Sequence, residues 1–360
     1  MDYLYRLGEL FSGPGGLGLG ASWASARVEG AAIEHAWASD YDLDTCQTYS
    51  RNVIGGEGTE WSFLPPSVIH ADIREYDISS LPPIDALAFG APCNDFSQIG
   101  EKKGFQGDFG PLYSYGVQVL KSHKPRWFLF ENVGGIRGGN FERICADFEA
   151  AGYRLYPHYY DFSLYGVPQK RRRVIVVGIR NDLDVEFKVP APVEADISVR
   201  TALCGIPADA GNHEPTRTSP TTVARLRCIN PGQNAWTAEL PEHLRINTNT
   251  KIPSMYRRLD PEKPSYTVTG GGGGGYHIYH WDEPRPLTSR ERARLQSFPD
   301  DFVFVGGKES VRKQIGMAVP PRGAAVIFEA ILKSFTGEEY AWVESNMPRV
   351  SPTALKAVAA

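Results

Sequence analysis

A cysteine and a glutamate lie near the ends of two apolar runs, where each could do chemistry. Cys93 directly follows Pro92 in "FGAPCNDFSQIG", and polar residues come after it. A buried thiol is the common state of a cysteine, but this context argues against simple core packing and favours a displayed nucleophile. Glu131 ends the apolar part of "FLFENV", where burying a carboxylate is costly unless the group is partnered or protonated.

The combination of this thiol and this carboxyl group limits the chemistry. Glu131 could cap a helix or pair with an arginine, but a raised pKa would also let it hydrogen-bond or protonate a ring nitrogen near neutral pH. The sequence shows no histidine or asparagine arranged with Cys93 as in a cysteine protease. We therefore expect addition of the thiol to an electron-poor ring, of which cytosine is an example.

A glycine-rich loop follows the first apolar run. The stretch "GELFSGPGGLGLG" contains Gly13-x-Gly15-x-x-Gly18, which is typical of a strand that turns tightly into a helix beside a cofactor. Asp40 follows a second apolar run and could accept hydrogen bonds from a ribose. Such a turn can also serve only to reverse the chain. If it binds a cofactor, NAD, FAD and S-adenosylmethionine all stay open here, because all three carry adenosine.

The elements that must position these residues alternate between apolar runs and amphipathic stretches up to about residue 182. This alternation predicts βαβ units around a mainly parallel sheet, whose ligands lie at the carboxyl ends of the strands. The glycine-rich turn at 13–18, "GAPC" and "ENV" all fall at such ends, so they should converge on one crevice. The predicted strands are 3–11, 31–39, 84–90, 125–133 and 172–179, and a helix is predicted at 110–123.

Residues from about 190 to 285 differ in composition from those before them. The proline-rich "VPAPVEADISV" predicts a boundary, after which Pro, Thr, Asn and Gly increase. Residues 217–258 contain seven basic and two acidic residues, which gives a local net charge of +5. This charge could serve contact with a nucleic acid, or it could be an ordinary solvated surface. The six consecutive glycines at 270–275 are either a flexible linker or a loop whose bare backbone enters a groove.

The composition excludes several classes of protein. With 360 residues, 42% hydrophobic and 22% charged, the chain has the composition of an ordinary soluble protein with one large core or two domains. Its net charge of −4 does not by itself indicate a nucleic-acid binder. No apolar stretch approaches about eighteen residues and no export signal is evident, so we expect a cytoplasmic protein without a membrane span. The five cysteines form no C-x-x-C pair, so neither a disulfide framework nor a metal site is expected.

A set of motifs in a fixed order resembles the DNA (cytosine-5) methyltransferase family from about residue 8 to 333. They are "FSGPGG", "GAPCNDFS", "FENV", "QKRRR", "RPLTSRERARLQSFPDDF" and "QIGMAVPP". The resemblance implies an α/β fold with the Rossmann-like, mainly parallel sheet of class I methyltransferases and a smaller, irregular, β-rich target-recognition domain. The expected parts are a catalytic and cofactor-binding domain at 1–189, the target-recognition domain at 190–285, a hinge at 286–313, a return segment at 314–335 and a tail at 336–360.

The same resemblance implies a reaction. Cys93 would add to carbon 6 of a cytosine flipped out of duplex DNA, while Glu131 contacts ring nitrogen 3 and carbon 5 takes the methyl group of S-adenosylmethionine. Arg171 and Arg173 would hold the nucleotide and the catalytic loop, with Arg173 nearer the base. The implied cofactor-binding residues are Phe11, Gly13, Gly15, Gly16, Asp40, Tyr41, Asp72, Pro92 and Met317. The implied DNA-contacting residues are Ser97, Arg227, Arg257, Gly272 and Gly273.

Three residues depart from the family's pattern. Asn94 replaces a glutamine after the nucleophile, Phe109 replaces an arginine, and Met317 replaces an asparagine near the donor. Two alternatives stay open: an RNA methylase acting on tRNA, which would usually show Cys-Phe-Thr and a shorter recognition domain, and a catalytically silent DNA-binding relative. The expected partners are double-stranded DNA and a restriction endonuclease that acts separately, and we expect a monomer that joins the nucleoid when bound to DNA.

Overall fold

The computed structural model describes residues 3–55, 64–91, 112–136, 139–193, 197–248, 250–273 and 275–348. The chain forms two compact units. Unit 1 consists of Met1–Asp161, Arg172–Pro192 and Ala324–Ala360, and unit 2 consists of Phe162–Arg171 and Val193–Gly323. These units differ from the predicted parts, because the short segment 162–171 joins unit 2 and the division near the C-terminus falls inside the predicted return segment.

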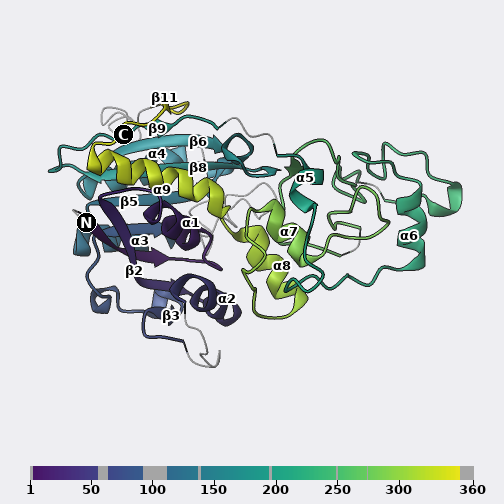
Figure 1. The fold of residues 1–360 in the computed structure, drawn as a ribbon, viewed down its shortest axis with the longest axis horizontal. Helices are drawn as coiled ribbons and strands as arrows, with labels where there is room; N and C mark the ends of the chain where they lie inside the picture. The colour runs from purple at the N-terminus through teal and green to yellow at the C-terminus, as the bar shows by residue number, and fades with distance from the viewer. Residues whose placement is uncertain are drawn as a thin grey trace. The chain divides into compact units, whose positions relative to one another are not determined.

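Unit 1 is built on a seven-stranded sheet with the order β3-β2-β1-β4-β5-β8-β6 (Figure 1). Its first five strands are parallel, whereas β8 lies antiparallel between β5 and β6. This is the mainly parallel sheet expected of a class I methyltransferase fold. The strands are β1 (Tyr3–Leu10), β2 (Ala31–Asp40), β3 (Val68–His70), β4 (Ala86–Phe89), β5 (Trp127–Val133), β6 (Tyr153–Asp161) and β8 (Arg172–Arg180).

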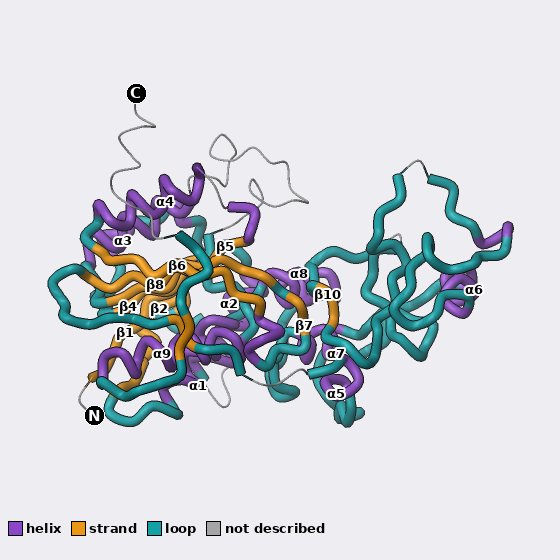
Figure 2. Tube along the Cα trace, turned by 90° about the horizontal axis from the view of Figure 1, so that it is seen from above, coloured by secondary structure: helices purple, strands orange, loops and turns teal. Residues whose placement is uncertain are grey.

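Helices cover both faces of this sheet (Figure 2). On one side lie α3 (Tyr113–His123) and α4 (Gly139–Ala150), and on the other lie α1 (Gly16–Ser25) and α9 (Pro321–Thr336). Alternation along β5 explains how both faces become apolar, because successive side chains of a strand point to opposite sides. Trp127 packs on Phe328 of α9 at 5.9 Å between ring centroids, whereas Phe128 packs on Phe148 of α4 at 4.8 Å.

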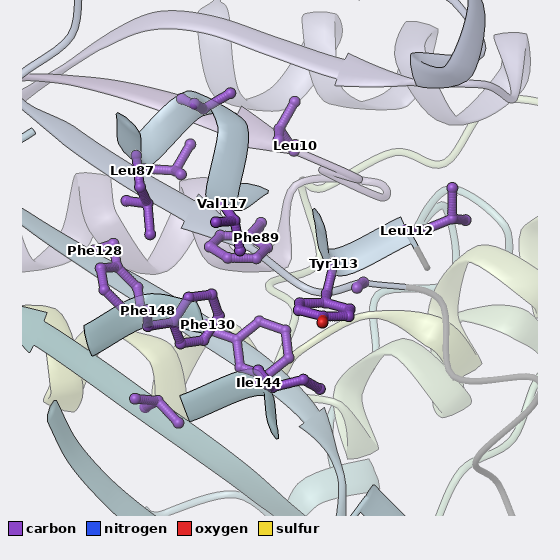
Figure 3. Close-up of a cluster of buried hydrophobic side chains, with 14 of the residues drawn as sticks. Leu10, Leu87, Phe89, Leu112, Tyr113, Val117, Phe128, Phe130, Ile144 and Phe148 are labelled. Carbon is purple, nitrogen blue, oxygen red and sulfur yellow. The ribbon is translucent and has the colours of Figure 1, made fainter. Parts of the chain in front are cut away.

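The core beneath α3 and α4 is rich in aromatic rings, as Figure 3 shows. Two glycines make room for them. A Cβ atom on Gly116 of α3 would lie 2.4 Å from the Phe89 ring, and one on Gly178 of β8 would lie 1.9 Å from the Phe128 ring. Both distances are shorter than van der Waals contact, so neither position can accept a side chain without moving the core.

Smaller elements complete unit 1. The helix α2 (Leu43–Tyr49) follows β2 and begins at the N-cap Asp42, whose carboxylate accepts a hydrogen bond from the Thr45 N–H at 3.0 Å. Near the C-terminus, β11 (Trp342–Val343) pairs antiparallel with β9 (Val189–Pro190). The helical stretch Lys308–Thr336 is long and apolar enough to cross a membrane, but 78% of its most apolar window is buried in the protein, as in the core helix of a soluble protein.

Unit 2 is irregular, as expected, but its described part is rich in loops rather than in strands. Its only named strands there, β7 (Gln169–Lys170) and β10 (Ser265–Tyr266), have two residues each and pair in parallel. The many prolines and glycines of this region remove donors and side chains that a longer ladder needs. Its helices are α5 (Val199–Leu203), α6 (Pro220–Arg227), α7 (Ser289–Leu295) and α8 (Lys308–Met317).

In unit 2 a buried arginine forms hydrogen bonds to backbone carbonyl oxygens that strand pairing would otherwise satisfy. Arg258 donates hydrogen bonds to the carbonyl oxygens of Leu226 and Ile229, both at 2.9 Å, and to those of His280 and Trp281. It is therefore a structural residue, although it belongs to the basic segment that raised the expectation of DNA binding. An apolar cluster of Leu226, Ile229, Ala235, Met255, Tyr256 and Tyr279 lies beside these contacts.

The hinge region contains a helix with a complete N-terminal cap. Thr288 is the N-cap of α7, and its hydroxyl accepts from the Glu291 N–H at 3.1 Å. In return the Glu291 carboxylate accepts from the Thr288 N–H at 2.8 Å, which completes a capping box. Arg285 pairs with the same carboxylate at 2.8 Å. The start of α7 is thus fixed by hydrogen bonds at three residues.

Candidate active site at the carboxyl edge of the sheet

The glycine-rich loop at residues 11–16 joins β1 to α1 with unusual backbone angles. Because it is predicted to bind the methyl donor, it is called the donor loop here. Phe11, Gly13 and Gly15 all have positive φ, at 53°, 57° and 101°. Glycine adopts such angles without strain, whereas Phe11 is a non-glycine residue in the left-handed region, which often marks a functional site. A Cβ atom on Gly13 would meet nothing within 4 Å, and one on Gly15 would lie 2.6 Å from Val53. The loop thus presents bare backbone at Gly13 and packs closely at Gly15.

Asp40 at the end of β2 ties the donor loop to the sheet. One carboxylate oxygen accepts from the Gly13 N–H at 3.0 Å, and the other accepts from the Asp42 N–H at 3.1 Å. Burial raises the pKa of Asp40, and the hydrogen bonds from these two N–H groups oppose that rise. A carboxylate has about four acceptor sites, so Asp40 keeps capacity for ribose hydroxyls.

Tyr41 and Asp72, which are also predicted to bind the methyl donor, lie close to Asp40 at the carboxyl edge of the sheet. Tyr41 directly follows Asp40 and is 56% exposed. Asp72 follows β3, which pairs with β2 so that His70 lies opposite Asp40. The Asp72 carboxylate accepts from the Arg74 guanidinium at 2.9 Å, and this pair lowers the pKa of Asp72. The bare loop, the half-buried Asp40 and the exposed Tyr41 fit an adenosine-bearing group.

A buried polar cluster that the sequence analysis missed lies behind the loop. Glu9 of β1 is fully buried, and its carboxylate accepts a short hydrogen bond from the Tyr49 hydroxyl. His35 lies 3.6 Å from the same carboxylate oxygen and 2.8 Å from the Ser22 hydroxyl of α1. A Cβ atom on Gly18 would lie 2.7 Å from Glu9, which explains why the third glycine of the loop is needed. The signal in the sequence was a charged residue inside the apolar run of β1.

The predicted acid lies two strands away from β1, on β5. Glu131 is 9% exposed, and its carboxylate lies 2.9 Å from the Nε of Arg173 on the neighbouring strand β8. The register explains the contact, because Glu131 is opposite Ile175 and Arg173 is its diagonal neighbour. On the other side, a Cβ atom on Gly90 would lie 3.0 Å from the second carboxylate oxygen. The structure thus brings together two of the predicted catalytic residues.

The chain that leads toward the nucleophile begins beside this acid. Asn132 donates a hydrogen bond at 3.2 Å to the carbonyl oxygen of Ala91, so its amide joins the end of β5 to the residue after Gly90. Pro92 and Cys93 follow Ala91 in the sequence but lie outside the described residues, as do Asn94, Ser97 and Phe109. Asn132 was not singled out in the sequence, although it directly follows Glu131 in "ENV".

Comparison with known proteins decides the family. The sequence profile of C-5 cytosine-specific DNA methylases matches residues 5–333. The chain is 51% identical to the Type II methyltransferase M.BbvI of Brevibacillus brevis, over 95% of this chain and 94% of that protein. It is 36% identical to the Type II methyltransferase M.NgoFVII of Neisseria gonorrhoeae, over 91% of this chain and 86% of that protein.

The chain belongs to the C-5 cytosine-specific DNA methylase family. The predicted enzyme class, a DNA (cytosine-5-)-methyltransferase, is confirmed with it. Among solved structures, a DNA modification methyltransferase from an Escherichia coli prophage matches with a TM-score of 0.71 and 23% identity, over 92% of this chain and 99% of that one. The S. pombe Dnmt2 methyltransferase matches with a TM-score of 0.57 and 16% identity, over 92% and 99% of the two chains. At these identities the two structures support the fold alone.

Two further predicted site residues of this methylase belong to unit 2. Arg171 is 1% exposed, and its guanidinium donates to the carbonyl oxygens of Val268 at 3.2 Å and Gly316 at 3.1 Å. One of these hydrogen bonds therefore fixes the backbone at Val268, just before the run of six glycines at 270–275. The predicted contact of Arg171 with the nucleotide stays a prediction. Met317 is the last residue of α8 and is 55% exposed. Since the donor loop belongs to unit 1, the assignment of Met317 to the donor site also stays a prediction.

The predicted DNA-contacting residues of unit 2 differ in their surroundings. Arg227 at the end of α6 is exposed, whereas Arg257 is half-buried and lies over the Tyr266 ring at 4.4 Å. Gly272 and Gly273 are exposed, and Gly273 has a φ of 108° that disfavours any other residue. These positions suit contact with a groove or a backbone, and which of them meet DNA stays a prediction.

Proposed function

We propose that this methyltransferase uses Cys93 to form a transient covalent bond with a cytosine flipped out of duplex DNA. The observation that supports the site most strongly is the Glu131–Arg173 pair at 2.9 Å, at the same edge of the sheet as the donor loop. The ligand crevice of such a fold lies where the strand order reverses, here between β1 and β4. Glu131 on β5 is one strand from that point.

The proposed roles follow from the side chains. The Cys93 thiolate adds to carbon 6, and Glu131 contacts ring nitrogen 3 and the exocyclic amine, so that carbon 5 becomes nucleophilic. Bound S-adenosylmethionine would supply its methyl group to carbon 5 as the bond between that methyl group and the sulfonium sulfur breaks. Carbon 5 would then lose its proton to a base as the bond between carbon 6 and the Cys93 sulfur breaks, which returns the thiolate. Arg173 holds the Glu131 carboxylate in the orientation that this contact needs.

S-adenosylmethionine is the proposed methyl donor, and it supplies the electrophilic methyl group when bound. Phe11, Gly13, Gly15 and Gly16 would hold it with the backbone of the loop and the start of α1. Asp40 would accept from the ribose hydroxyls, Tyr41 would flank the adenine, and Asp72 would accept from its amine. Pro92 and Met317 complete the proposed donor set.

Unit 2 would carry the contacts that choose the DNA sequence. We propose Arg227 and Arg257 as contacts to phosphates and Gly272 and Gly273 as contacts to base edges, with Ser97 as a further contact. The relatives named Type II methyltransferases support a place in a restriction-modification system, in which a separate endonuclease cuts the same sequence. A cytoplasmic monomer that associates with the nucleoid through DNA is the corresponding cellular proposal.

The experiment compares transfer of a labelled methyl group to duplex DNA with transfer to tRNA. The proposal predicts label in DNA alone, and bisulfite sequencing of DNA from cells that express the chain then reports the target sequence. Label in tRNA alone would support the RNA methylase. Binding of DNA without label in either substrate would support a silent relative.

A further inference from the structure

Two arginines of unit 2 have buried guanidinium nitrogens without a hydrogen-bond partner among the described residues. Arg292 of α7 is 1% exposed, and its Nη1 atom donates a hydrogen bond to the Thr269 carbonyl oxygen at 3.4 Å. Its Nε and Nη2 atoms have no acceptor within the described part of the chain. Arg312 of α8 has the same feature at Nε, while its Nη2 lies 3.3 Å from Glu309, whose side chain is 95% exposed.

This arrangement is costly in the free protein. A buried guanidinium loses its hydration, and among the described residues neither a carboxylate nor a full set of carbonyl oxygens replaces that hydration for Arg292. Burial and the charge of Arg312 lower the pKa of Arg292 to about 10, so the group is still protonated at neutral pH. Two adjacent cations with unused donors form a site that an anion would stabilise.

Gly272 and Gly273, from the run of six glycines at 270–275, lie beside this site. A Cβ atom on Gly272 would lie 3.2 Å from Arg312 and 3.0 Å from the ring of His277. The Gly273 N–H donates to Nε2 of His277 at 3.0 Å, whereas Nδ1 of His277 is buried without a partner among the described residues. Gly272 and Gly273 are both exposed and lie against His277, and Gly272 also lies against Arg312. A run of glycines changes conformation with little steric cost, so it can open such a site.

We propose that Arg292, Arg312 and His277, here called the arginine cluster, bind a phosphate diester of the DNA backbone and thereby seat the glycine loop on DNA. A phosphate supplies both the negative charge and the oxygen acceptors that the cluster lacks, and the planar guanidinium matches its geometry. None of these three residues is among the predicted DNA contacts. The inference rests on the proposed function, because it takes duplex DNA as the substrate.

The test measures binding of the full chain to a short fluorescein-labelled DNA duplex as sodium chloride is raised. Each lost phosphate contact makes the slope of log K, the association constant for DNA, against the logarithm of the salt concentration shallower by about 1. Arg292→Met and Arg312→Met should each show this change. Arg292→Lys, which keeps a charge, should restore part of it. Because Arg292→Met removes an unpaired buried charge, its melting temperature without DNA should equal or exceed that of the wild type.

Arg200→Gln is the matched control. Arg200 is also in unit 2, but it is exposed and pairs with Glu262 at 2.6 Å, so its loss should leave the slope unchanged. Wild-type slopes in both Met variants would overturn the proposal, whatever their melting temperatures. If inorganic phosphate at constant ionic strength raises the melting temperature of the wild type alone while the DNA slopes are unchanged, the cluster binds free phosphate and the DNA assignment is wrong.

Methyl transfer is measured separately, so the two proposals fail in different ways. A wild-type protein that methylates DNA, with unchanged slopes in the Met variants, retains the proposed function and loses the phosphate site. A wild-type protein that transfers no methyl group, with shallower slopes in the Met variants, loses the proposed catalysis and retains the site.

Discussion

At the scale of the residue, the proposed chemistry depends on the Glu131 carboxylate, which the structure pairs with Arg173. The two residues come from adjacent strands and are diagonal neighbours in the register, so the sheet itself sets their distance of 2.9 Å. Gly90 leaves space at the second oxygen, where a side chain would lie at 3.0 Å. Arg173 pairs with the first oxygen, and we propose that the second oxygen contacts the substrate.

Glu131→Gln tests this arrangement because it keeps the shape of the side chain but removes both its negative charge and its ability to donate a proton. We expect methyl transfer to fall by about 100-fold or more, since general acid catalysis contributes roughly that much. Donor affinity, measured by calorimetry, should stay within the error of the wild type because the donor residues lie on other strands. Near wild-type turnover in Glu131→Gln would contradict the proposed role.

Tyr49→Phe tests the buried cluster behind the donor loop. Removing the hydroxyl leaves the fully buried Glu9 carboxylate without its short hydrogen bond. We expect a loss of about 1–3 kcal/mol in the free energy of unfolding, because an unsatisfied buried acceptor carries its full desolvation cost. Tyr41→Phe, at a 56% exposed position, is the control and should change little. Equal urea unfolding curves for Tyr49→Phe and the wild type would show that the bond contributes nothing.

At the scale of the element, the sequence predicted the strands well and their directions less well. The runs at 3–11, 31–39 and 125–133 correspond to β1, β2 and β5, because each is apolar over the length of one strand. The antiparallel direction of β8 is not encoded in its own residues, since it follows from the hairpin with β6. In the expected target-recognition domain the irregular character is seen, but its described residues contain only one complete strand, the short β10, and Arg258 and short turns hold the backbone there.

The site shows the same division between local and long-range information. The positive φ angles at Gly13 and Gly15 were predictable, because only a tight turn requires glycine at such spacing. Pairing of Glu131 with an arginine was one of the alternatives, but the identity of that arginine as Arg173 was not predictable, because it depends on the register of β5 against β8. Likewise, the burial of Arg171 and Arg292 depends on which segments of unit 2 lie over them, and a charge pattern predicts exposure instead.

The edge strand β6 provides a pH-dependent contact with the C-terminal segment. The ring of His158 is 6% exposed, and its Nδ1 accepts from the Asn346 N–H at 3.3 Å. Burial lowers the pKa of His158 to about 4, below the usual value of about 6.5 in an unfolded chain. The unfolded chain therefore binds this proton first as the pH falls.

Stability should consequently decrease between about pH 6.5 and pH 4, by about 1.4 kcal/mol for each pH unit from this histidine alone. Above that window His158 is neutral in both states and contributes no slope. The comparison of melting temperatures at neutral and mildly acidic pH between the wild type and His158→Gln isolates the effect. If the variant loses stability with acid as steeply as the wild type, another group is responsible.

At the scale of the whole molecule, the division of charge matches the division of labour that we propose. The chain as a whole has a net charge of −4, while residues 217–258 of unit 2 carry a local charge of +5 from seven basic and two acidic residues. An overall negative charge limits non-specific association with DNA, and a local positive segment places attraction where recognition is needed. Unit 1 would then supply the chemistry and unit 2 the choice of sequence.

The central claim is that Cys93 bonds covalently to a cytosine in duplex DNA. A duplex in which every cytosine is replaced by 5-fluorocytosine tests it, because fluorine at carbon 5 cannot leave as a proton and the bond to sulfur then persists. With S-adenosylmethionine present, the wild type should form a complex that survives denaturing electrophoresis, and Cys93→Ser should form none while still binding DNA. A stable complex with Cys93→Ser, or none with an active wild type, would contradict the account.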